Sequence, residues 1–357
     1  MTDSSPEAES RSLTLVERAE ALGLGNVDYG PFGGPATGDA PLNTATLTPP
    51  EAPPSHSVQT PKPEVMVSVS EPKRAFFHAV PFILLHLGCL AVFWVGWSWP
   101  AVAMAVGMYV ARMFAITGFY HRYFSHKSFH TSRVMQFLFA VAGNSAVQRG
   151  PLWWAAHHRH HHRHSDEPED VHSPVRRSFL YSHVGWIFEP RNWPTKHELM
   201  SDLNSYPELR LLDKYDKVVP MLLLFAVFFA GYLMEHYAPS LGATGMQMIV
   251  WGLISTVALW HGTFTINSLA HTWGSRVYDT TDTSRNNFFL ALITLGEGWH
   301  NNHHHFPGSA RNGFRWWEVD LTYYGLWMMS KIGLVWDLRP VPAHVMQRNQ
   351  IESAAKK

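Results

Sequence analysis

Histidines at helical spacing are the residues of this 357-residue chain whose types and positions indicate chemistry. The stretch WAAHHRHHHRHSD carries three histidines at i, i+3 and i+4, which are His158, His161 and His162. This spacing places three side chains on one face of a helix. The distant stretch GEGWHNNHHHFP repeats the pattern at His300, His303 and His304. Three imidazoles on one face form half of a metal site, so the two stretches together predict a metal centre.

Two shorter motifs add candidate ligands. His121 and His126 in HRYFSH are five residues apart, an offset too large for one straight helical face, so we expect them where a helix ends and turns. Asn267 and His271 in NSLAH lie one helical turn apart. The alternative interpretation of the histidine-rich run is a solvated low-complexity tract or an adventitious chelator. The repeated spacing and the positions of the other motifs favour a built site.

The composition restricts the metal. The single cysteine, Cys89, lies inside an apolar run, which excludes a thiolate zinc site or an iron–sulfur cluster made by this chain alone. The ligands must therefore be nitrogen and oxygen atoms. Zinc is satisfied by four ligands, whereas nine histidines predict two metals. Imidazole suits iron, copper, nickel and zinc, and two irons in such a shell would bind and activate O2.

The chain divides into three compositional blocks. Residues 1–70 are rich in proline and acidic residues, and we expect them to form a disordered tail. Residues 71–340 form the predicted membrane domain, and residues 341–357 a polar C-terminal tail. The whole chain is 46% hydrophobic and 16% charged with a formal net charge of zero, so charge suggests no nucleic-acid partner.

Four apolar runs are long enough to cross a bilayer, which takes about 20 residues. They cover residues 75–99, 101–120, 218–237 and 246–268. Lysine and arginine precede the first run, follow the second and precede the third, whereas the two short hairpins carry neither. The positive-inside rule therefore predicts cytoplasmic termini and a cytoplasmic active site in a multi-pass protein. We expect a bacterial inner membrane. All the predicted ligands then lie on one side of it.

Two further apolar segments are too short or too aromatic to span. Residues 134–147 and 314–336 should lie at the membrane interface, where aromatic side chains act as anchors. The predicted fold class is therefore all-α, with four transmembrane helices and a cytoplasmic helical cap that holds the metals. Histidines outside the motifs are interpreted as structural or interfacial, namely His78, His86, His183, His236 and His261.

At these motifs the chain resembles the membrane Δ9 acyl-lipid and acyl-CoA desaturases, the stearoyl-CoA desaturase family. HRYFSH, HHRHHHRHSD and GEGWHNNHHHFP match its three histidine boxes, NSLAH matches its asparagine–histidine motif, and SHVGW is a flanking match. The resemblance runs from about Ala75 to Pro340. It implies a di-iron site with nine ligands, which are His121, His126, His158, His161, His162, His271, His300, His303 and His304. It implies that Asn267 reaches one iron through water, and that His157, His160, His164 and His305 are not ligands.

The implied reaction removes two vicinal hydrogens from a saturated acyl-CoA or acyl-lipid and forms a cis double bond, expected at Δ9, while O2 is reduced to water. Two electrons would come from a separate protein of the ferredoxin, rubredoxin or cytochrome b5 type with its reductase. Four cations are candidates to bind the phosphates of CoA or of a lipid head group, namely Arg176, Arg177, Arg191 and Lys196. Tyr109, 12 residues before His121, is a candidate for the closed end of the substrate tunnel or for an outer-leaflet anchor.

Two other functions fit part of the pattern. A membrane di-iron hydroxylase of fatty acids or alkanes shares histidine boxes but inserts oxygen, and the motifs NSLAH and GEGWHNN favour the desaturase over it. A histidine-rich metal transporter or sensor would place ionisable groups along a path through the spans, whereas these motifs gather at one face.

Overall fold

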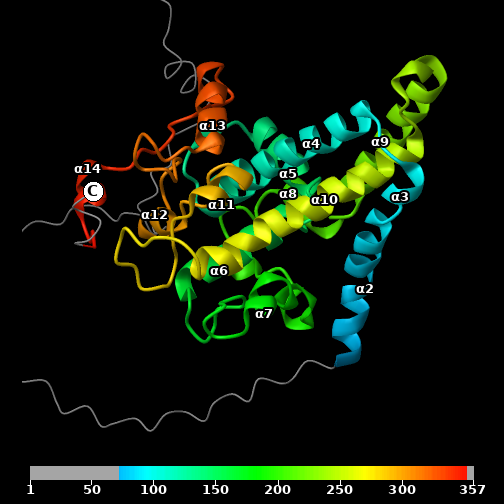
Figure 1. Ribbon diagram of the computed structural model, residues 1–357. Helices are drawn as coiled ribbons and strands as arrows, with labels where there is room; N and C mark the ends of the chain where they lie inside the picture. Colours follow the sequence, from blue (N-terminus) through cyan, green and yellow to red (C-terminus); the bar gives the residue numbers. More distant parts are fainter. Residues whose placement is uncertain (1–71, 352–357) are drawn as a thin grey trace, which may run out of the picture. The chain divides into compact units, whose positions relative to one another are not determined.

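The computed structural model describes residues 72–351 of the chain (Figure 1). The predicted disordered tail at residues 1–70 lies outside the described residues, as do residues 352–357 of the predicted C-terminal tail. The described part is predominantly helical, as the sequence predicts. Its strands are β1 (His130–Thr131) and β2 (Val335–Trp336), which pair antiparallel over two residues each.

Four helical segments are long and apolar enough to cross a membrane, at residues 77–95, 99–125, 218–237 and 245–271, and they match the four predicted spans. The first comprises α2 (Pro72–Cys89) and α3 (Val92–Val95). The second comprises α4 (Trp99–Phe114) and its continuation η1 (Ala115–Ser125). The third is α9 (Val218–Tyr237), and the fourth is α10 (Gly245–Ser268) followed by η6 (Leu269–His271).

The outward faces of these helices are apolar. On α9, for example, Met221, Leu222 and Phe225 expose 63%, 63% and 67% of their surface. A continuous apolar helix surface of this kind is stable in lipid and not in water. The described part is therefore that of an integral membrane protein.

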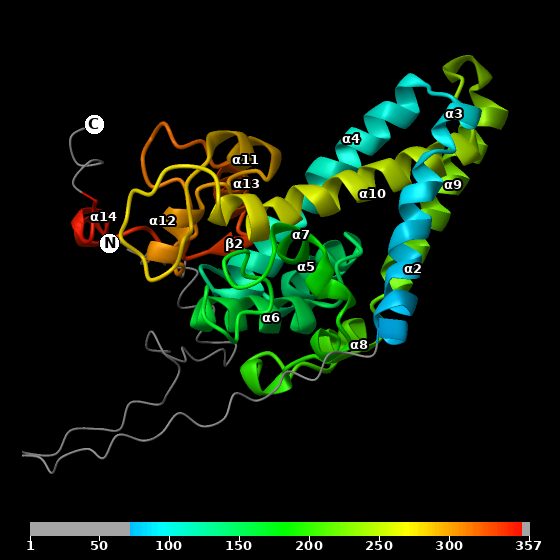
Figure 2. The same cartoon turned by 60° about the horizontal axis from the view of Figure 1, so that its bottom comes forward.

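The hairpin between the first two spans turns at Gly96 to Ser98, just before the dipeptide Trp99-Pro100. Gly96 has a positive φ of 69°, and Ser98 caps α4 by accepting a hydrogen bond from the Ala101 amide. Pro100 belongs to the first turn of α4, where a missing amide hydrogen costs nothing. This hairpin and the one between α9 and α10, which contains η5 (Pro239–Leu241), lie at the same end of the bundle (Figures 1 and 2).

The opposite end of the bundle carries the cap. Its α-helices are α5 (Arg133–Asn144), α6 (Pro151–His164), α7 (Phe179–His183), α8 (Pro207–Lys214), α11 (Phe288–Ile293), α12 (His300–His305), α13 (Leu321–Lys331) and α14 (Ala343–Gln347). Short 3₁₀ turns lie between α7 and α8, namely η2 (Gly185–Phe188), η3 (Pro190–Asn192) and η4 (His197–Leu199). Figure 2 shows α6 and α12 beside the cap ends of the long helices.

The two short apolar segments predicted at the membrane interface form α5 and the region of α13. Both keep large side chains exposed, such as Val134 (69%), Trp316 (82%) and Ile332 (71%). The buried side of α5 packs on η1, where the rings of Phe119 and Phe139 stack with centroids 3.7 Å apart. The cap is thereby fixed to the second span at the level of the histidines.

Candidate metal centre

The structure brings the nine predicted histidines together in two groups. The five-histidine group consists of His121, His126, His158, His162 and His303, and the four-histidine group of His161, His271, His300 and His304. Within each group, one ring nitrogen of every member lies within 4.8 Å of the others. The sequence spacing predicted that the histidines converge, but it did not predict how they divide.

Helices α6 and α12 each contribute to both groups. On α6, His158 and His162 at i and i+4 enter the five-histidine group, whereas His161 enters the four-histidine group. On α12 the arrangement is reversed, because His300 and His304 share the four-histidine group and His303 enters the other. The i, i+4 pair is thus the chelating unit, and the third histidine of each helix connects the two groups.

The pair His121 and His126 is brought into one group by an unusual helix. Residues 115–125 form a π-helix, in which the amide of residue i+5 bonds to the carbonyl of residue i, and His126 follows as its C-cap. The prediction that the pair lies where a helix ends is therefore confirmed. A spacing of five residues is too wide for one face of an α-helix, but the wider turn of a π-helix, with its i→i+5 hydrogen bonds, brings such residues closer to one face.

The contacts between ring nitrogens are those of a metal shell and not of a hydrogen-bonded cluster. Neighbouring Nε2 atoms lie 2.9–3.0 Å apart along the sequence His121, His303, His162, His158, His126. A neutral imidazole nitrogen either carries one hydrogen or offers one lone pair, so at most two of these four contacts can be hydrogen bonds. A metal with nitrogen ligands at about 2.1 Å in octahedral positions sets neighbouring nitrogens about 3.0 Å apart. The donor set therefore fits a metal ion.

Buried carboxylates hold the outer ring nitrogens. Nδ1 of His121 lies 2.6 Å from Glu297, Nδ1 of His161 lies 3.0 Å from Asp170, and Nδ1 of His271 lies 3.4 Å from Asp166. Nδ1 of His304 contacts Asp282 in the same way, while its Nε2 is buried without a hydrogen-bond partner. Carboxylates that accept from one nitrogen direct the other toward a metal. These four acidic residues are functional positions that the sequence did not identify.

Burial keeps His162 and His304 neutral, which is the state that binds a metal. Burial lowers the pKa of His162 well below its ordinary value, and the neighbouring His304 and His158 lower it further. Burial likewise lowers the pKa of His304, which Asp282 raises only in part, to about 4. For Asp170, burial raises the pKa, but His161 and His172 outweigh it and hold the pKa well below the usual range. The Asp170 carboxylate is therefore ionised, and it outweighs the effect of burial to raise the pKa of His161 above its ordinary value.

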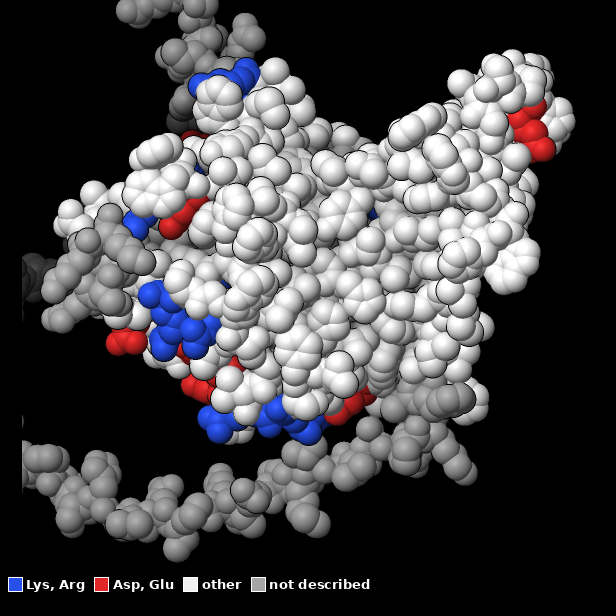
Figure 3. Space-filling model, viewed as in Figure 1, with Lys and Arg blue, Asp and Glu red and all other residues white. Residues whose placement is uncertain are grey.

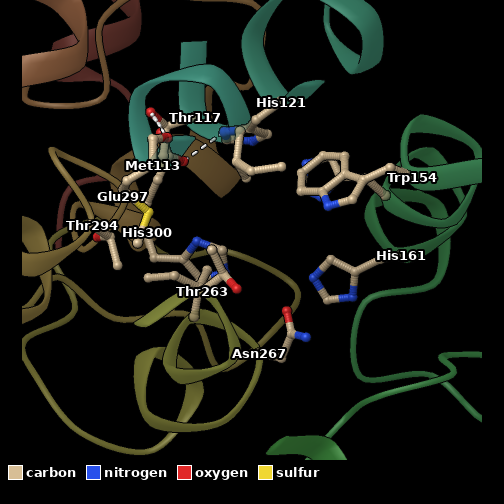
Figure 4. A pocket seen from close by; sticks show the side chains of 13 residues that line it. Met113, Thr117, His121, Trp154, His161, Thr263, Asn267, Thr294, Glu297 and His300 are labelled. Atoms are coloured by element: carbon tan, nitrogen blue, oxygen red, sulfur yellow. Dashed lines mark hydrogen bonds and ion pairs between the residues drawn. The ribbon is translucent and has the colours of Figure 1, made fainter. Parts of the chain in front are cut away.

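A cavity of about 60 Å³ lies between the two groups. His121 and His158 from one group, His161 and His300 from the other, and Asn267 all line it. In Figure 4, the side chains of His121, His161, His300 and Asn267 surround the cavity together with those of Trp154, Met113 and Thr263. Asn267, which the resemblance implies to reach one metal through water, lies in this lining together with His161 and His300 of the four-histidine group.

Gln148 connects the two sides of the cavity wall. Its amide nitrogen donates to Thr263 Oγ1 at 2.9 Å, and its carbonyl oxygen accepts from Trp154 Nε1 at 3.2 Å. The flanking residues Val147 and Arg149 both have positive φ, 60° and 70°, which non-glycine residues rarely adopt. The strained backbone thus holds Gln148 between α6 and α10. The sequence gave no signal for this role.

The predicted substrate residues lie around the site but not in the cavity lining. Tyr109 on α4 donates a hydrogen bond to the Ile293 carbonyl at 2.6 Å. Its hydroxyl and the Met113 methyl approach Gly262 so closely that an added Cβ there would lie 2.9 and 3.0 Å from them. Because Met113 lines the cavity, Tyr109 lies directly behind its wall.

The four predicted phosphate-binding cations lie on the segment between α6 and α8. Arg176 donates to the Asp166 carbonyl at 2.7 Å, Arg177 lies over the ring of Tyr181, and Arg191 pairs with Glu189 and reaches the Tyr181 hydroxyl. Lys196 is half-buried, and burial lowers its pKa. Figure 3 shows Lys and Arg side chains along the edge of the cap below α7.

The extra histidines of the boxes make other contacts. His157 Nδ1 bonds to the Trp153 carbonyl, His160 to the Glu169 carbonyl, His164 to the Glu167 carboxylate and His305 to the Val345 carbonyl. These four histidines belong to neither the five-histidine group nor the four-histidine group.

Comparisons with known proteins identify the family of this chain. The fatty acid desaturase family model matches residues 97–331. The chain is 35% identical over 276 residues to an acyl-CoA 5-desaturase of Anemone leveillei, which covers 76% of this chain and 81% of that protein. It is 33% identical over 267 residues to the Delta-9 acyl-lipid desaturase 1 of Arabidopsis thaliana (74% and 83%). It is 32% identical over 274 residues to the sn-1 stearoyl-lipid 9-desaturase of Anabaena variabilis (76% and 96%). The chain therefore belongs to the fatty acid desaturase family and is a membrane oxidoreductase that desaturates fatty acyl chains.

Proposed function

We propose that the two histidine groups bind two iron ions and that the enzyme introduces a cis double bond at Δ9 of a saturated acyl-CoA or acyl-lipid. The observation that carries the proposal is the cavity that touches both groups. An acyl chain in it would meet histidines of both groups together with Trp154, Met113 and Thr263. The nine histidines are the proposed ligands, and Asn267 is proposed to act on the four-histidine site through water.

The chain's own residues supply orientation. When bound, the irons would supply the oxidising power for the O2-dependent step, in which two hydrogens of the acyl chain, two electrons and two protons give two molecules of water. Trp154, Gln148 and Thr263 form a fixed wall, so one pair of carbons is held against the oxidant while the other methylenes are not. Tyr109 behind this wall is proposed to limit the length of the chain beyond the double bond.

Position and carrier follow from where the acyl chain is anchored. Two of the relatives named above are desaturases at position 9 and one at position 5, and their names give acyl-CoA as the substrate in one case and lipids in the others. We propose that Arg176, Arg177, Arg191 and Lys196 hold the phosphate-bearing end. The histidine end of the bundle is proposed to face the cytoplasm of a bacterium. There a separate ferredoxin, rubredoxin or cytochrome b5-type protein with its reductase would deliver electrons.

The test is expression in a desaturase-deficient host, with gas chromatography and mass spectrometry of the fatty acids and iron analysis of the purified protein. We expect monounsaturated products two mass units lighter than their precursors, a double bond at carbon 9, and two irons per chain. Products heavier by one oxygen would instead indicate a hydroxylase. Desaturation by protein that holds no iron would contradict the assignment of the metal.

A further inference from the structure

Three histidines outside the two groups form a chain of their own. His86 on α2, His261 on α10 and His183 on α7 come from elements far apart in sequence. His86 Nε2 lies 3.0 Å from His261 Nε2, and His261 Nδ1 lies 3.0 Å from His183 Nε2. His183 Nδ1 lies 2.9 Å from Ser268 Oγ. This histidine chain, His86–His261–His183, therefore connects two membrane-spanning helices to the cap.

One carbonyl group determines the tautomer of every ring. His86 Nδ1 lies 2.7 Å from the Phe82 carbonyl oxygen, which only accepts, so Nδ1 carries the hydrogen. In a neutral His86 the other nitrogen accepts, and His261 Nε2 must donate to it. His261 Nδ1 then accepts from His183 Nε2, and His183 Nδ1 accepts from the Ser268 hydroxyl, whose single hydrogen points to this ring and not to the Phe264 carbonyl 3.0 Å away.

All contacts of the histidine chain can thus be hydrogen bonds at the same time. This is the opposite of the five-histidine group, in which the same nitrogen is shared between two neighbours. The chain therefore has the properties of a fixed hydrogen-bonded link and not of a metal shell. A fully satisfied polar network of this kind holds its members rigidly.

The link ends where α10 changes into the 3₁₀ turn η6. There the carbonyls near the helix end need other partners, since the α-helical bonding pattern stops. Ser182, the residue before His183, donates from Oγ to the Asn267 carbonyl at 2.8 Å. Ser182 and Ser268 are both completely buried. Helix α7 thus hydrogen-bonds to two adjacent residues at the end of α10. Ser182 bonds to Asn267, and His183 bonds to Ser268.

We propose that Ser182 and His183, anchored through His261 and His86, are positioning residues that fix the turn carrying Asn267 and His271 at the four-histidine site. The inference rests on the proposed metal-binding function and adds residues that contact no predicted ligand side chain. The inference predicts an effect on one site only. Removing these hydrogen bonds should weaken metal binding at the four-histidine site, because its member His271 lies on the turn. Metal binding at the five-histidine site should stay unchanged.

The test is iron release from the full-length holoenzyme in detergent after addition of a ferrous chelator. We expect two phases, and a His271→Ala variant identifies the phase of the four-histidine site. Ser182→Ala and His261→Leu should accelerate that phase by roughly 3- to 10-fold, because each removes a neutral hydrogen bond that holds the turn and not a partner of a ligand ring. His261→Gln should release iron at nearly the wild-type rate, because a carboxamide both donates and accepts.

The matched control is His236→Leu on α9. Like His261, His236 lies in a span. Like His86, it bonds through Nδ1 to the carbonyl four residues earlier, which is that of Tyr232 at 3.0 Å. It is not part of the histidine chain. Wild-type release rates in Ser182→Ala and His261→Leu would overturn the proposal. So would equal acceleration of both phases, or a Gln variant as fast as the Leu variant. A wild-type protein that binds no iron would refute the proposed function itself, so the two failures are distinguishable.

Discussion

Replacing Glu297 by glutamine should weaken the five-histidine site alone. Three donors converge on this buried carboxylate. Arg122 reaches Oε1 at 3.0 Å, while His121 Nδ1 and Asn312 Nδ2 reach Oε2 at 2.6 and 3.1 Å. In either orientation, the amide nitrogen of a glutamine faces at least one of these donors. Every orientation therefore loses a charge-assisted hydrogen bond.

The size of the effect follows from that loss. A hydrogen bond to a charged group contributes about 1.5–3 kcal/mol. At about 1.4 kcal/mol per factor of ten, this corresponds to roughly 10- to 100-fold weaker metal binding, as is usual for an outer partner of a ligand. The four-histidine group rests on Asp166, Asp170 and Asp282 and should bind as before.

The measurement is equilibrium dialysis of the purified protein against Co²⁺ and a competing chelator. We expect two metals per chain in the wild type and one in Glu297→Gln at intermediate chelator concentrations. Glu318→Gln is the control, because Glu318 is equally buried but accepts from Asn302 and the Arg315 amide and contacts no predicted ligand. Two metals of wild-type affinity in Glu297→Gln, or an equal loss in the control, would refute the reasoning.

The other predictions concern ligands, substrate and pH. His161→Ala and His303→Ala should each abolish desaturation while membrane insertion persists, whereas the control variants His160→Ala and His305→Ala should stay active. The measurement is fatty acid analysis of membranes, and activity in either ligand variant would contradict the assignment. Asn267→Ala should lose most of its rate and keep part of its iron, and full activity would remove Asn267 from the site. Tyr109→Ala should shift preference toward substrates a few methylenes longer, each worth about 0.8 kcal/mol, whereas Tyr109→Phe should not; an unchanged profile across chain lengths would assign Tyr109 to anchoring. Burial raises the pKa of Asp202, but Arg159 and Lys127 outweigh it and lower the pKa to about 2. Its contribution to stability should therefore be complete above the unfolded-chain pKa near 4 and disappear as pH falls toward 2. Thermal melting at pH 5 and 3 should show a smaller acid-induced loss in Asp202→Asn than in the wild type, and equal losses would contradict this.

Helical periodicity was sufficient to predict the spans and the convergence of the histidines. Apolar runs of about 20 residues and the i, i+3, i+4 pattern are local properties, and local properties are visible in one sequence. The division of the histidines into groups of five and four was not predictable. The pattern tells which residues share a face, but which metal each ring meets depends on how α6 and α12 pack against each other.

The remaining parts of the site depend on tertiary contacts. Asp166, Asp170 and Asp282 come from loops and reach the histidines without any regular spacing. Glu297 could have been noticed, because it stands three residues before His300 in GEGWH. The π-helix at residues 115–125 overrides the α-helical periodicity on which the His121–His126 argument was based. Gln148 gave no sequence signal, and the histidines of the chain, although noted, have no regular spacing that predicts their contacts.

Helices α6 and α12 each carry histidines of both groups, so the packing of these two helices sets how far apart the groups lie. Among the described residues, neither the five-histidine group nor the four-histidine group includes a carboxylate. Two metals bound there would be spaced by the rise and rotation of the two helices. A shift of either helix would therefore displace ligands of both groups at once, and neither position could be adjusted without the other.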